Sequence, residues 1–84
     1  MAGNSEVQEK LLQFICRNYI VDREDIILDQ SLVDQGIIDS FGLVEISGFF
    51  KTEFNLAVAE NEMTRANFGS VLKMVDFVKR KTEV

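Results

Sequence analysis

The chain has 84 residues, of which 14 are acidic and nine are basic, and its net charge is −5. A chain of this length buries only one small core, so residues 1–84 are expected to form a single domain, and the acidic balance disfavours nucleic acid and anionic membranes as partners. Proline and histidine are absent and cysteine occurs once, which favours a small all-α protein and argues against an enzyme, a metal site or an internal disulfide.

The first helix is predicted to begin near Asn4 or Ser5, either of which can cap it, and to extend to about Asn18. One face carries apolar residues at helical spacing and is expected to pack on the core. Cys16 lies beside this face and is expected to be a partly buried apolar residue rather than a reactive thiol. The start of the chain lacks the runs of a targeting signal, so a cytoplasmic protein without a membrane span is expected. The residues of the face are Val7, Leu11, Phe14, Ile15, Asn18 and Tyr19.

A long loop is predicted over residues 19–38, where no helical period persists. A loop of this length is compatible with a compact domain only if its scattered apolar residues attach it to the core. Residues 29–34 are expected to contain a short turn with Leu32 pointing inward. The acidic residues of this segment do not have the spacing of an EF-hand, so they are interpreted as solvated side chains and not as a calcium site.

The segment Gly36-Ile37-Ile38-Asp39-Ser40 combines a turn residue, an apolar anchor, a helix-capping aspartate and a serine that opens a helix. The second helix is predicted from Ser40 to about Phe54, with Asn55 in the left-handed conformation that ends many helices. Phe41, in the first turn, is expected either to remain exposed or to fold inward over the loop. The residues assigned to one face of this helix, expected to be buried, are Leu43, Ile46, Ser47, Phe50 and Phe54, with Val44 extending it.

The last third of the chain is predicted to contain a short helix over residues 60–66, a break over residues 67–70 and a final helix to about Lys81. The short helix cannot be stable alone and must dock on the rest of the protein. Ser70 is expected to cap the final helix. The predicted buried residues of that helix are Val71, Met74, Val75, Phe77 and Val78.

This order of elements and the Asp39-Ser40 pair resemble the acyl carrier proteins over nearly the whole chain. The resemblance implies a four-helix bundle with a long loop between the first two helices and a short third helix. It also implies that Ser40 carries a 4′-phosphopantetheine arm, with Asp39 as the other residue of the motif and as the helix cap. Acyl intermediates of fatty-acid, polyketide or related lipid synthesis would be held on the arm as thioesters. The run Asp-Ser-Phe-Gly is also similar to the Asp-Ser-Met-Gly of D-alanyl carrier proteins, which gives an aminoacyl cargo as the alternative. The competing class is a helical protein-interaction module in which Asp39-Ser40 is only a cap.

The resemblance further implies a phosphopantetheinyl transferase and acyl-loading and acyl-processing enzymes with basic docking surfaces as partners of a monomeric carrier. Lys51 and Thr52 reduce the acidic character of the second helix. Partner recognition is therefore expected near the serine. The residues assigned to recognition are Phe41, Gly42 and Glu45. Those assigned to an acyl cavity are Val44, Ile46, Phe50, Met63 and Val71.

Overall fold

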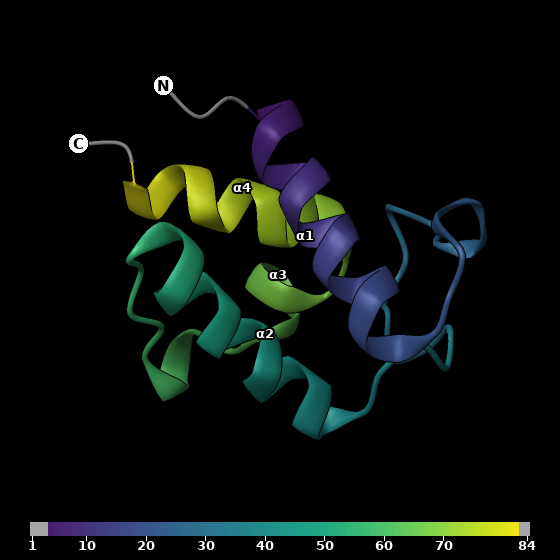
Figure 1. Ribbon diagram of the computed structural model, residues 1–84. Coiled ribbons are helices and arrows are strands. Elements are labelled where there is room, and N and C mark those ends of the chain that lie inside the picture. Colours follow the sequence, from purple (N-terminus) through teal and green to yellow (C-terminus); the bar gives the residue numbers. More distant parts are fainter. Residues whose placement is uncertain (1–3, 83–84) are drawn as a thin grey trace.

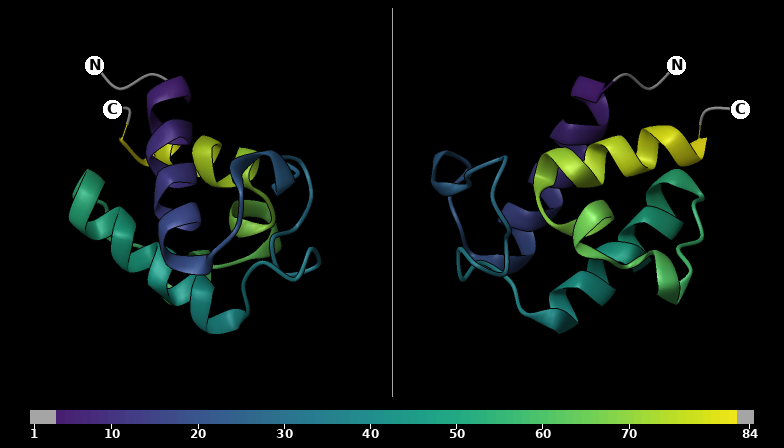
Figure 2. Two further views of the ribbon diagram at one scale, coloured as in Figure 1. Left: turned by 45° about the vertical axis from the view of Figure 1, so that its right-hand side comes forward. Right: turned by 180° about the vertical axis from the view of Figure 1, so that it is seen from behind.

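The computed structural model describes residues 4–82, and within that range it is all-helical, without a strand. Three longer helices and one short helix make up the bundle, and α3 lies between α2 and α4 when the molecule is seen from behind (Figures 1 and 2). This arrangement confirms the all-α four-helix fold with a long first loop and a short third helix. No helix in residues 4–82 is both long and apolar enough to cross a bilayer. The helices are α1 (Asn4–Tyr19), α2 (Ser40–Phe54), α3 (Arg65–Phe68) and α4 (Val71–Thr82).

Aromatic rings fill the centre of the bundle. Phe50 of α2 has no exposed surface and lies 5.7 Å, between ring centroids, from Phe68 of α3, which lies 5.3 Å from Phe77 of α4. Such close, tilted pairs add to the stabilisation from burying the rings. The three rings therefore join α2, α3 and α4 through one continuous contact. The other buried apolar side chains of the helices are Val7, Leu11, Leu12, Ile15, Ile46, Val71, Met74, Val75 and Val78.

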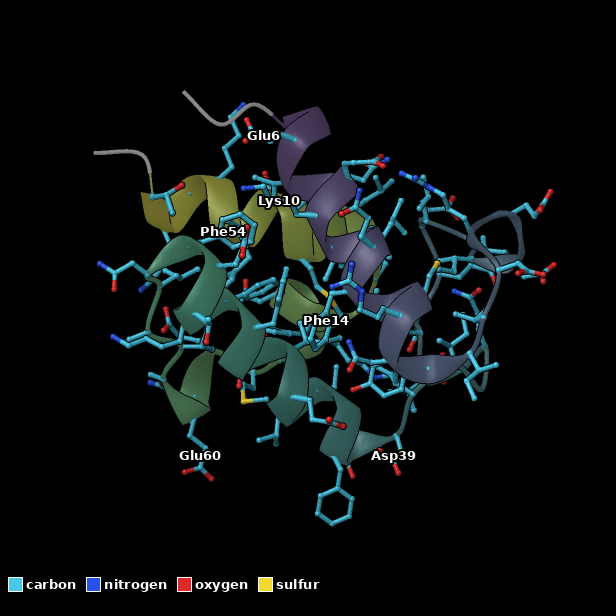
Figure 3. The ribbon with its side chains drawn as sticks, in the orientation of Figure 1. Glu6, Lys10, Phe14, Asp39, Phe54 and Glu60 are labelled. Carbon is cyan, nitrogen blue, oxygen red and sulfur yellow. The ribbon has the colours of Figure 1, made fainter. Side chains whose placement is uncertain are left out.

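A second aromatic contact joins α1 to α2. The ring of Phe14 stacks on the ring of Phe49, with centroids 4.4 Å apart and an angle of 26° between the planes. Phe14 points from α1 toward α2 in Figure 3. Phe14 and Phe49 are only partly buried, and both rings line an open groove between the two helices, so this stack lies outside the inner core.

The long loop is attached to the core by three buried side chains, Ile26, Leu32 and Ile38, so the expectation for Leu32 is confirmed. A single 3₁₀ turn at Arg23–Asp25 interrupts the loop. The backbone N–H of Leu72, in the first turn of α4, donates to the carbonyl oxygen of a loop residue, Leu28, at 3.1 Å. Apolar burial and this bond explain how about 20 residues without a helical period remain ordered.

The side-chain amide of Gln35 closes this loop on itself. Its oxygen accepts from the N–H of Ile27 at 2.9 Å, and its nitrogen donates to the carbonyl oxygens of Ile27 at 2.9 Å and of Gln30 at 3.0 Å. One side chain therefore satisfies three backbone groups that no helix or strand satisfies. Nothing in the sequence pattern singled out Gln35, because a lone glutamine in a polar segment has no distinctive signal.

The helix boundaries agree with expectation in the second and fourth helices. α2 runs from Ser40 to Phe54, Asn55 is left-handed with φ of 53°, and the Oγ of Ser70 accepts from the N–H of Lys73 at 3.2 Å as a cap of α4. The buried face predicted for α4 is confirmed. The expected capping of α1 by Asn4 or Ser5 concerns side chains outside the described part of the chain.

Two predictions about secondary structure and burial are wrong. The short helix was expected over residues 60–66, but those residues begin with a 3₁₀ turn at Glu60–Glu62 and the helix is Arg65–Phe68. Thr64, in an extended conformation, accepts from the N–H of Phe68 at 2.7 Å, and the buried Phe68 fixes where this single turn forms. Val44 was expected to extend the buried face of α2 but is 58% exposed, since it is turned away from the core.

Candidate modification site at the start of α2

Asp39 caps α2 and leaves the following serine exposed. The backbone of Asp39 is extended, and its carboxylate oxygen Oδ1 accepts from the N–H of Gly42 at 3.0 Å. This bond satisfies one of the amide groups that have no partner within a first turn. Ser40 is the first residue of the helix and is exposed. Figure 3 shows Asp39 at the start of α2, and because Ser40 is exposed, its hydroxyl is accessible to another molecule.

Gly42 allows this end of the helix to pack closely on the loop. A Cβ atom at Gly42 would lie 2.7 Å from the Cβ of Ile38 and 3.4 Å from the hydroxyl oxygen of Tyr19. Gly42 was assigned to the recognition surface together with Phe41 and Glu45, but it is buried. The reason is that the turn directs this position inward, toward Ile38, while Phe41 and Glu45 remain exposed.

Tyr19, the last residue of α1, connects that helix to the start of α2. Its hydroxyl donates to the Oε1 of Glu45 at 2.9 Å. Burial, together with this hydrogen bond and the negative charge of Glu45, raises the pKa of Tyr19 to about 12. Glu45 therefore has a structural partner within the protein as well as an exposed carboxylate. No sequence pattern links residues 26 positions apart, so this contact was not foreseen.

We expect the contribution of Tyr19 to the stability of the protein to decrease at alkaline pH. Its folded-state pKa lies above the ordinary value of 10.0, so the stabilisation is fully present below pH 10 and is lost as the pH rises toward 12. At pH 8 the variant Tyr19→Phe is expected to be less stable by about 0.5–1.5 kcal/mol, the usual net value of one hydrogen bond. Urea unfolding of both proteins at pH 8, 10 and 11.5 measures the difference, and a gap that does not narrow contradicts this assignment.

A cavity of about 240 Å³ opens beside Ser40, between α2, the long loop and the α3 region. Apolar side chains and a polar rim both contribute to its wall. Of the five residues assigned to an acyl cavity, Met63 lines it, Ile46, Phe50 and Val71 have no exposed surface, and Val44 is exposed on the outside. The wall is formed by Val33, Leu43, Met63, Phe68 and Gly69, with Ser31, Ser40, Thr64 and Arg65 as the polar members.

These residues fit a phosphopantetheine group chemically. An exposed serine hydroxyl is the attachment chemistry of a phosphodiester, and the start of a 15-residue helix favours a negative charge. Arg65 lines the same cavity, and its only ion-pair partner among residues 4–82 is the exposed Asp34, at 3.9 Å. The apolar wall provides a surface for the uncharged part of an arm.

Comparison with other proteins finds relatives that match most of the chain. No protein-family model matches the chain. The chain is 34% identical over 73 residues to the D-alanyl carrier protein of Streptococcus uberis, an alignment that covers 87% of this chain and 91% of that protein. It is 29% identical, over the same length and coverage, to the D-alanyl carrier protein of Streptococcus pyogenes serotype M5.

Proposed function

Since the chain belongs to the acyl carrier protein family of phosphopantetheine-bearing carriers, we propose that it carries a small aminoacyl group, of the D-alanyl type, on an arm attached to Ser40. The observation that carries this proposal is the similarity to D-alanyl carrier proteins over 87% of the chain. Of the two cargo classes expected from the sequence, a fatty-acyl or polyketide chain was the main expectation and an aminoacyl group the alternative. The similarity favours the alternative.

The packing of the core supports a small cargo. A long acyl chain needs an interior space to hide from water, but Phe50, Phe68 and Phe77 occupy the centre of the bundle in one continuous contact. The cavity beside Ser40, at about 240 Å³, is smaller than the roughly 300 to 1,000 Å³ of pockets that enclose drug-sized ligands. An aminoacyl group has little apolar surface to bury and does not need such a space.

The residues around Ser40 have separate parts in this proposal. When bound, the prosthetic group supplies a thiol that holds the cargo as a thioester. Asp39 fixes the start of α2 and so the position of the Ser40 hydroxyl, while Arg65 supplies a positive charge to the wall of the same cavity. The protein acts as a single cytoplasmic domain over residues 1–84, without catalysis of its own, and delivers its cargo as a monomer to enzymes with basic docking surfaces.

The proposal is tested by loading the protein in two steps. Incubation with coenzyme A and a broad-specificity phosphopantetheinyl transferase is expected to add the mass of one arm, and a D-alanine-adenylating ligase with ATP and D-alanine is then expected to add one alanyl group. Intact-protein mass spectrometry measures both steps. A parallel reaction with a long-chain fatty acid and an acyl–carrier ligase is the control for cargo size.

Two outcomes contradict the proposal. A protein that the transferase leaves unmodified favours the interaction module, in which Asp39-Ser40 is only a helix cap. A protein that accepts the long acyl chain, gains thermal stability from it and rejects D-alanine favours the fatty-acyl class instead, because stabilisation indicates burial of the chain.

A further inference from the structure

The groove between α1 and α2, here called the α1–α2 groove, shares no lining residue with the cavity beside Ser40. It measures about 340 Å³, and the stacked rings of Phe14 and Phe49 line it. Both rings are only partly buried. The stack joins the two helices, and it also leaves aromatic surface open to solvent, where an apolar group of another molecule can contact it.

Lys10 and Glu53, which both line the groove, compensate each other's charge. The Nζ of Lys10 lies 3.0 Å from the Oε1 of Glu53 and 3.7 Å from the Oε1 of Glu6. It also lies 5.9 Å from the centre of the Phe54 ring, and Figure 3 shows the two side chains close together. Because carboxylates of the same protein already pair with Lys10, we assign it no ligand.

Arg17 is the second cation of the groove, and it is exposed. It takes no part in an ion pair within residues 4–82. Arg17 follows Phe14 by three residues on α1, and residues at this spacing are neighbours on a helix surface, with Cβ atoms about 5–6 Å apart. A guanidinium group that is suited to bidentate binding of a carboxylate therefore lies next to the aromatic stack.

The remaining walls of the groove determine the kind of ligand that fits. Gln13, Asn18 and Glu53 are exposed, so the groove cannot enclose a small molecule in the way that ligand pockets do, which bury about 70–90% of the ligand surface. It suits a side chain of a partner protein that lies across the surface. The rings favour an aromatic or aliphatic side chain, and Arg17 favours a carboxylate beside it.

The groove lies away from the modification site. Phe49 follows Ser40 by nine residues on α2. This spacing is about two and a half helical turns, so the two residues lie on opposite sides of the helix and about 13 Å apart along its axis. A segment bound to the α1–α2 groove therefore leaves Ser40 uncovered.

We propose that the α1–α2 groove binds an acidic segment of a partner protein, in which an apolar side chain contacts Phe14 and Phe49 and an adjoining carboxylate pairs with Arg17. The apolar contact supplies affinity, and the charge pair fixes the orientation of the segment. This partner is opposite in charge to the basic enzyme surfaces proposed to receive the cargo, so the carrier can be held by one protein while Ser40 faces another. The inference goes beyond the proposed function and does not depend on it.

The test uses the isotope-labelled, unmodified protein and a blocked heptapeptide of alanine with Leu-Phe-Glu at its centre. Two further peptides replace the glutamate by glutamine or the phenylalanine by alanine, and decanoate is the probe for a small amphiphilic ligand. Arg17→Gln removes the proposed partner of the carboxylate. Arg65→Gln is the matched control, because it changes the net charge equally at an exposed arginine that does not line the groove. NMR titration measures Kd and identifies the amides that respond.

We expect the glutamate peptide to shift the amide signals of Phe14, Arg17 and Phe49. Arg17→Gln is expected to raise the Kd of this peptide about fivefold, the upper range for one exposed charge pair, whereas Arg65→Gln leaves it unchanged. The glutamine peptide is expected to bind wild type and Arg17→Gln equally, and the peptide without phenylalanine is expected not to bind. Both variants are expected to melt at the wild-type temperature, which excludes a loss of structure as the cause.

Several results overturn the inference. Equal weakening by Arg17→Gln and Arg65→Gln indicates a general attraction to positive charge, and signal shifts confined to the surroundings of Ser40 place binding elsewhere. Tighter binding of decanoate than of the peptide, with shifts in the groove, indicates a small amphiphile as the ligand, and the absence of shifts at millimolar peptide indicates no site. The titration is repeated on the phosphopantetheine-bearing protein, where a raised Kd contradicts the independence of groove and arm. None of these results depends on cargo loading, so failure of the proposed function is seen separately.

Discussion

Replacement of Ser40 by alanine is expected to abolish phosphopantetheinylation completely, because the exposed hydroxyl of Ser40 is the one that lies both at the start of α2 and at the cavity among the described residues. The fold is expected to persist. The cap of α2 comes from the carboxylate of Asp39 and the N–H of Gly42, both of which the substitution leaves in place, and alanine is a strong helix former. Intact-protein mass spectrometry after incubation with the transferase measures the modification, and circular dichroism measures the helix content.

Ser47→Ala is the matched control for this experiment. Ser47 lies on the same helix, and its hydroxyl donates to the carbonyl oxygen of Val44 at 2.6 Å, so it is a serine of α2 without a place at the cavity. The control variant is expected to gain the full mass of one arm. Modification of Ser40→Ala at any residue, or loss of its helical signal, contradicts the view that Ser40 has a mainly functional role.

The second large effect is expected at Gly42. Its alanine variant needs space where the Cβ of Ile38 would be only 2.7 Å away, so α2 and the loop must move apart. Overpacking of this kind costs about 1–3 kcal/mol, although alanine is the better helix former. We expect a fall of several degrees in melting temperature, since about 1 kcal/mol shifts a domain of this size by about 4–8 °C.

Gly48→Ala separates this steric effect from helix propensity. Gly48 lies in the same helix, and no atom beyond its chain neighbours and the surrounding backbone of the helix would come within 4 Å of an added Cβ. The substitution is therefore expected to stabilise the protein by up to about 1 kcal/mol. Opposite signs for the two glycines, measured by urea unfolding, support the packing explanation. Stabilisation by both substitutions indicates that Ile38 yields without cost.

Local patterns in the sequence predict the helices that have clear ends. Asp39 and Asn55 limit α2 at the expected residues, and Ser70 begins the last helix as expected, because each of these residues acts on backbone groups only a few positions away in the chain. The short helix was predicted at the wrong residues because its position does not depend on local backbone contacts. Its position depends on burial of Phe68 against Phe50 and Phe77, which is a tertiary contact that no local pattern describes.

The same distinction applies to the candidate site. Asp39 and Ser40 were identified from a local motif, and the structure gives them the cap and the exposure that the motif requires. The contacts of Gly42 with Ile38 and of Tyr19 with Glu45 were not predicted. In the sequence, Gly42 looks like an unfavourable helix residue, and only the packed loop reveals its use. Phe41 was expected either to be exposed or to fold inward over Ile37 or Ile38. The structure shows that it is exposed, which depends on how the loop packs and not on a local pattern.

The amide of Gln35 has a consequence for the motions of the protein. It binds the backbone of Ile27 through both a donor and an acceptor, and the neighbouring Leu28 accepts from the N–H of Leu72 in α4. A fluctuation that lifts this part of the loop therefore breaks the Gln35 bonds and also releases the first turn of α4. The loop and that turn belong to one cooperative opening unit. Their amide protons should exchange with solvent on a common timescale, distinct from that of the α1 and α2 cores.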